Sequence, residues 1–129
     1  MFNKSQLKAI DKVISTGLIE AGIDYVLFID MAGNTIAKHD NGKNRLDSIA
    51  FAALAAGNFA AVDAMAKLVG ESEFSLLFHK GKKSSIHFSK VNDDTILITM
   101  FTKDISLGLV RLKVSEAMKQ INKILVKNW

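Results

Sequence analysis

Hydrophobic positions along the chain follow two spacings, one typical of helices and one typical of strands. Near the N-terminus, apolar residues recur every three or four positions, which predicts an amphipathic helix over residues 3–21. Asn3 can cap its start, and Gln6 three positions later completes a capping box. The same spacing near the C-terminus predicts a last helix over residues 106–127.

Five short apolar segments predict β-strands. The first of them, residues 25–29, is apolar throughout, as in a strand that is covered on both faces. The others span residues 35–38, 74–80, 84–91 and 95–101. The element order αββαβββα predicts an α+β fold with a five-stranded antiparallel sheet between helical layers. A length of 129 residues suits a single domain over residues 1–129.

The segment 48–70 predicts a long central helix with two apolar faces when it is wound at about 3.6 residues per turn. The large face should lie on the sheet; its members are Phe51, Leu54, Phe59, Val62, Met65 and Val69. The small face would let another backbone come close; its members are Ala53, Gly57, Ala60 and Ala64. We interpret the small face as the seam of a homodimer. The alternative interpretation is an ordinary alanine-rich core helix.

Composition limits the class of protein further. Apolar residues make up 49% of the chain and charged residues 23%, a balance typical of soluble domains. Polar residues interrupt the central helix at Asn58, Asp63 and Lys67, so we predict no membrane insertion. The absence of cysteine excludes disulfides and thiolate metal sites, and it agrees with a cytoplasmic protein.

The sequence offers little material for catalysis. Its three histidines lack the spacing of a metal site, and it has no cysteine nucleophile or nucleophilic serine motif. We therefore predict no catalytic, cofactor-binding or metal-binding residues, and no enzyme activity. Lysines line the outer sides of the first and last helices, where solvated faces are expected. No aromatic residues interleave with them, so we predict no nucleic-acid partner.

Three segments carry a resemblance to a known family. They are Asp30-Met31-Ala32-Gly33-Asn34, Ala55-Ala56-Gly57-Asn58-Phe59-Ala60-Ala61 and Ser106-Leu107-Gly108-Leu109-Val110-Arg111. Together they resemble the Roadblock family of the dynein light-chain type, and within it the bacterial proteins similar to MglB. The resemblance implies a profilin-like fold and a homodimer. In that dimer the central helices pack antiparallel and the following edge strands join two sheets, here through Phe74, Leu76 and Phe78.

The same resemblance implies a non-catalytic scaffold that binds a small Ras-like GTPase of the MglA type and modulates its nucleotide cycle. We place the GTPase contact on the arc between the two faces of the central helix, at Ala52, Ala56, Asp63 and Lys67. A second hypothesis is a small-ligand sensor domain of the profilin-like or PAS-like α+β type. The strands carry few polar groups that could orient a ligand, which disfavours that hypothesis.

Overall fold

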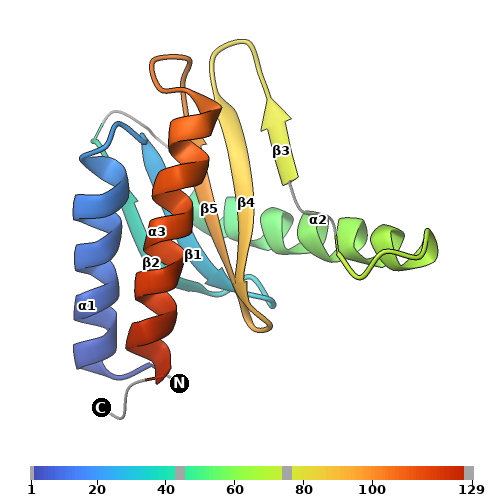
Figure 1. Cartoon of the computed structure of the whole chain (residues 1–129), viewed down its shortest axis with the longest axis horizontal. Helices are drawn as coiled ribbons and strands as arrows, with labels where there is room; N and C mark the ends of the chain where they lie inside the picture. Colours follow the sequence, from blue (N-terminus) through green and yellow to red (C-terminus); the bar gives the residue numbers. More distant parts are fainter. Residues whose placement is uncertain (1, 43–45, 74–76, 127–129) are drawn as a thin grey trace.

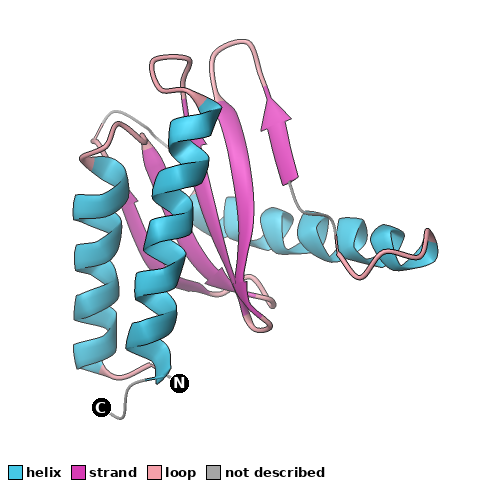
Figure 2. Cartoon of the chain, in the orientation of Figure 1, coloured by secondary structure: helices cyan, strands magenta, loops and turns pink. Residues whose placement is uncertain are grey.

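A computed structural model describes residues 2–42, 46–73 and 77–126 of the chain. Helices α1 and α3 cover one side of a β-sheet, and helix α2 lies on the other side (Figure 1). This arrangement of three layers confirms the predicted α+β fold (Figure 2). The helices are α1 (Lys4–Ile14), α2 (Ser48–Leu68) and α3 (Leu107–Val126), with a π-helical turn η1 (Ser15–Ile19) after α1. The strands are β1 (Tyr25–Asp30), β2 (Thr35–Asp40), β3 (Leu77–Lys80), β4 (Ser85–Asn92) and β5 (Thr95–Phe101).

All neighbouring strands in the five-stranded sheet run antiparallel, in the order β2-β1-β5-β4-β3. The two edges are therefore β2 and β3. The predicted strand over residues 74–80 corresponds to β3 from Leu77 onward. Phe74 and Leu76, two of the residues expected at the dimer edge, lie outside the described residues.

The first helix begins as the sequence predicts. The Asn3 side chain accepts a hydrogen bond from the Gln6 amide at 2.8 Å, and Gln6 Oε1 accepts one from the Asn3 amide at 3.0 Å. This reciprocal pair confirms the capping box. The helix then widens instead of continuing regularly to residue 21. In η1, the Glu20 amide donates to the Ser15 carbonyl at 3.1 Å, a bond five residues long.

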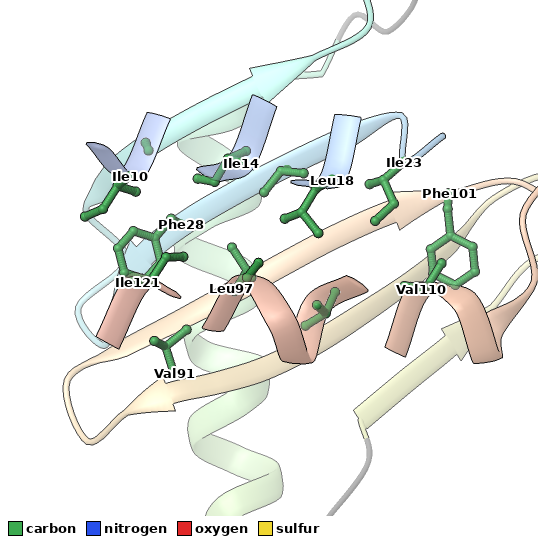
Figure 3. Close-up of a cluster of buried hydrophobic side chains, with 14 of the residues drawn as sticks. Ile10, Ile14, Leu18, Ile23, Phe28, Val91, Leu97, Phe101, Val110 and Ile121 are labelled. Carbon is green, nitrogen blue, oxygen red and sulfur yellow. The ribbon is translucent and has the colours of Figure 1, made fainter. Parts of the chain in front are cut away.

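The larger core lies between the sheet and the pair α1 and α3. Figure 3 shows that side chains of both helices point toward those of β1 and β5. The fully buried members include Ile10, Ile14, Phe28, Leu97 and Ile121. Burying each such side chain stabilises the fold by about 1.5–3 kcal/mol. This layer therefore holds α1 and α3 in place and leaves α2 as the separate layer on the opposite side.

A buried histidine also lies on the α3 side of the sheet. His87 in β4 is 6% exposed, and its Nδ1 lies 3.1 Å from Ser89 Oγ. Burial lowers the pKa of His87 to about 4, and the positive charge of Arg111 adds to this effect. The imidazole is therefore neutral in the folded protein at neutral pH.

We expect the free energy of unfolding to fall as the pH is lowered from about 6.5 to about 4. Over this interval the unfolded chain takes up a proton on His87 that the folded protein does not bind, so acid favours unfolding. The interval between the two pKa values limits this loss to about 3 kcal/mol. Urea unfolding at several pH values should show a smaller loss for His87→Gln, which keeps a polar group but does not titrate. The same pH dependence in both proteins would contradict the assignment.

Candidate partner-binding surface

The turn between β1 and β2 is built around the carboxylate of Asp30. Its Oδ1 accepts hydrogen bonds from the Ala32 amide at 3.0 Å and the Asn34 amide at 2.9 Å, and its Oδ2 accepts one from Asn34 Nδ2 at 3.0 Å. Burial raises the pKa of Asp30, but these hydrogen bonds outweigh it and hold the pKa below its usual value. The turn is therefore a fixed unit at the end of the sheet.

Gly33 in this turn touches the backbone of α2. It has a φ of +91°, and a Cβ at this position would lie 3.1 Å from Ala53 Cα and 3.3 Å from the Ala52 carbonyl oxygen. Only glycine combines this backbone conformation with so close an approach. The contact fixes the first half of α2 against the β1–β2 end of the sheet.

Small residues form most of the side of α2 that lies on the sheet. Ala52, Ala55, Ala56 and Phe59 are buried there. They pack against Tyr25, Leu27, Ile29, Phe88, Ile96 and Ile98. These strand side chains are large, so the helix can lie close only where its own side chains are small.

The predicted orientation of α2 was wrong. Of the large face expected on the sheet, Phe59 is buried, but Leu54 is 74% exposed and both Met65 and Val69 are also exposed. The helix is turned so that alanines meet the sheet. Because α2 is apolar almost all round, its hydrophobic pattern did not define which side is buried.

This orientation corrects two of the four residues predicted to contact a GTPase. Ala52 and Ala56 are 0% and 6% exposed because they pack on the sheet, so they are not on the solvent side of α2. Asp63 and Lys67 form an ion pair, with Lys67 Nζ 3.2 Å from Asp63 Oδ2, and Lys67 is exposed. A contact of these two with a GTPase stays a prediction.

The small face of α2 is open to solvent. Ala53, Gly57, Ala60 and Ala64 are all exposed, and a Cβ at Gly57 would meet no atom within 4 Å. Glycine inside a helix costs about 1 kcal/mol relative to alanine, and no contact within the described chain requires it here. The small face is therefore available to another molecule, and its role as the dimer seam stays a prediction.

A hollow lies on the flank of α2, beside β3 and β4, and we call it the flank hollow. It is a hollow of about 230 Å³ lined by Phe51, Leu54, Ala55, Asn58, His79, Ile86 and Phe88. Asn58 Nδ2 lies 3.3 Å from His79 Nε2, which links α2 to the edge strand β3. This flank hollow could not be predicted from the sequence, because it depends on how α2 crosses the sheet.

Phe78, the described member of the predicted edge contact, points to the other side of the sheet. It packs against the α1/α3 core, and its ring stacks on Phe101 with centroids 6.0 Å apart. The backbone of β3 is nevertheless at the sheet edge, so strand pairing there remains open to a second copy.

The C-terminal half of α2 projects beyond β3 (Figure 1). Leu68 at its end is 86% exposed, and Met65 is exposed as well. By length and composition alone, α2 is the one helix in the described part of the chain that could cross a membrane. Its contact with the sheet through alanines instead makes it part of the folded domain. Exposed apolar surfaces are common at interaction sites, which makes this end of α2 a candidate surface for partner binding.

The fold agrees with the comparisons with known proteins. The model of the Roadblock/LC7 domain matches residues 11–101, so the chain belongs to the Roadblock/LC7 family. Within that family it is similar to MglB of Myxococcus xanthus, with 34% identity, a TM-score of 0.88, and coverage of 99% of this chain and 97% of that one. A comparison with curated proteins found no match.

Two further solved structures extend this likeness. The gliding protein MglB of Thermus thermophilus has 27% identity and a TM-score of 0.86, with 96% of this chain and 93% of that chain covered. Profilin II of Acanthamoeba castellanii has 18% identity and a TM-score of 0.61, covering 88% of this chain and 97% of that one. The chain is therefore an MglB-like Roadblock protein with a profilin-like fold.

Replacing Gly33 by alanine should lower the free energy of unfolding by about 1–3 kcal/mol, because it adds backbone strain and a clash with α2. Gly42→Ala is the matched control, since Gly42 has a φ of +80° but no atom of the described residues beyond its chain neighbours lies within 4 Å of a Cβ placed there. Urea unfolding should show a clearly larger loss for Gly33→Ala. Equal losses would mean that the contact between the turn and α2 contributes nothing.

Proposed function

We propose that the chain forms a homodimer that binds a small Ras-like GTPase and modulates its nucleotide cycle without catalysis of its own. The observation that carries this proposal is the exposed apolar surface of α2 in a chain that is similar to MglB over nearly its full length. One solved MglB is described as having a tetrameric arrangement, which supports self-association as a property of such proteins.

A second copy fits best beside α2, across the edge strand β3. If the sheet continues from β3 of one copy to β3 of the other, the projecting half of α2 comes to lie over the partner's sheet. The partner's helix then lies alongside α2 on the same joined sheet and fills the flank hollow around Leu54 and Ile86. This arrangement covers apolar side chains that solvent would otherwise surround.

The same geometry leaves the small face free. Ala53, Gly57, Ala60 and Ala64 lie on a different side of α2 from the flank-hollow residues Leu54 and Asn58, so they would not face a helix that lies beside β3. Their short side chains make a smooth platform that a GTPase could approach closely. We therefore assign the small face to the GTPase and the flank hollow to the second copy.

Charged residues beside the platform would set the register of the complex. Asp63 and Lys67 pair with one another on α2, and Lys67 is exposed. Charges at the rim of an interface mainly affect association rate and specificity, while the centre determines whether docking occurs. The protein's own part in the nucleotide cycle would then be to order the catalytic residues of the GTPase.

The dimer is tested by Leu54→Glu. Leu54 is largely exposed in a single copy, so the change should leave the fold intact, but a carboxylate in the flank hollow would lose its hydration without a partner. Sedimentation should show monomers for Leu54→Glu and dimers for the control Leu112→Glu, which alters another exposed leucine, on α3. Dimers in both proteins would remove the flank hollow as the site of association.

The GTPase contact is tested by Gly57→Arg. Space is open around Gly57 and arginine favours helix, so fold and dimer should be kept while docking is blocked. Calorimetry with an MglA-type GTPase, loaded with GDP or with a non-hydrolysable GTP analogue, should show at least about a hundredfold weaker binding, or about 3 kcal/mol. The control is Gly108→Arg, at an equally open glycine of α3.

Two results would contradict this assignment. Monomers in Gly57→Arg would make the small face the dimer seam, and undiminished binding would place the GTPase elsewhere. The hydrolysis rate of the GTPase, measured with and without the wild-type protein, tests the effect on the nucleotide cycle. An unchanged rate and unchanged nucleotide release would contradict that part of the proposal.

A further inference from the structure

A second hollow lies on the opposite side of the sheet from α2, where the β3–β4 hairpin meets the start of α3. Its volume is about 420 Å³. The stacked rings of Phe78 and Phe101 line it, as do Ile105 and Leu107 near the start of α3. Because α3 lies over the middle of the sheet, this end of β3 and β4 has no helix in front of it (Figure 1).

Four lysines surround this hollow. Lys80, Lys82 and Lys83 come from the hairpin, and Lys103 comes from the loop between β5 and α3. All four are exposed, and within the described residues none of them forms an ion pair. Positive charges gathered around one hollow repel one another, and a polyanion would relieve that repulsion.

The charged groups of the site are these lysines, and the start of α3 beside them is capped by its own chain. Ser106 caps that helix itself, since its Oγ accepts a hydrogen bond from the Leu109 amide at 3.1 Å. Because lysine ammonium groups are carried on long flexible side chains, they can bind carboxylates at several different spacings. They do not fix the orientation of one small molecule as the converging polar groups of a metabolite pocket do.

We propose that this lysine-rimmed hollow binds an acidic peptide segment of a partner protein. An apolar side chain of the peptide enters between Phe78 and Leu107, and the flanking carboxylates meet the four lysines. A nucleic acid fits the hollow less well, because Phe101 is buried and stacked on Phe78, which leaves no exposed aromatic pair for bases. The hollow and α2 lie on opposite sides of the sheet, so this partner is separate from the proposed GTPase.

The test uses a fluorescein-labelled synthetic peptide, EELEEFEE, and fluorescence anisotropy with the full chain. Saturable binding is expected, and it should weaken about tenfold or more in the double variant Lys82→Glu, Lys83→Glu, because the rim charge is reversed. The matched control is Lys119→Glu, Lys123→Glu, which makes the same charge change on α3 away from the hollow. Binding by this control should stay close to that of the wild type.

A second variant tests the hollow without changing charge. Ser85 lines it and pairs with Phe101 across the sheet, so Ser85→Phe should fill the space and weaken binding about tenfold or more. Circular dichroism and sedimentation show whether fold and oligomeric state are kept. Equal affinity for a peptide with alanine in place of its Leu and Phe would overturn the proposal. An equal loss of peptide affinity in the Lys119→Glu, Lys123→Glu control would also overturn it, as would the absence of saturable binding by the wild type. Tighter binding of the wild type to phosphatidylserine vesicles or single-stranded RNA than to the peptide would overturn it as well.

Discussion

The close contact between alanines on α2 and large side chains on the strands determines which side of α2 faces the sheet. It thereby also determines which side chains of α2 are left exposed. Leu27, Ile96 and Ile98 already fill the space above this side of the sheet, and Gly33 brings the turn directly against the helix backbone. Only a helix with a small buried side can lie there. Its larger apolar residues, such as Leu54 and Leu68, then point sideways or outward and are exposed in the single chain.

The helical layers on the two sides of the sheet consequently differ in how much apolar surface they bury. Helices α1 and α3 bury a continuous apolar layer that stabilises each copy. Helix α2 contributes a smaller buried cluster and leaves large apolar residues such as Leu54 and Leu68 exposed. The residues that bury the core are therefore largely different from the residues that we propose for association.

Local chemistry explains which features could be predicted from the sequence. The capping box of Asn3 and Gln6 and the turn at Gly33 depend on residues within a few positions, so their geometry follows from the sequence. The order of the elements follows from the change between helical and strand periodicity. These signals were sufficient for the α+β fold and for the resemblance to the Roadblock family.

The orientation of α2 could not be predicted in the same way. Which side of α2 faces the sheet is decided by strand side chains far away in sequence. A helix that is apolar on every side has no hydrophobic pattern that favours one side. The same limit applies to the lysine-rimmed hollow. Lys82 and Lys83 suggest only a solvated hairpin until the sheet order brings Lys103 and the start of α3 beside them.

The opposite edge of the sheet differs from β3 in its capacity for strand pairing. Strand β2 exposes Lys38, and His39 Nε2 lies 3.0 Å from Asp11 Oδ1, which ties the edge to α1. A register shift at Phe28/Ile29 makes the pairing with β1 irregular near one end. Charges and irregularities of this kind discourage the addition of another strand. Joining through β3 would therefore give a closed two-fold assembly, with no continuing edge from which a fibre could grow.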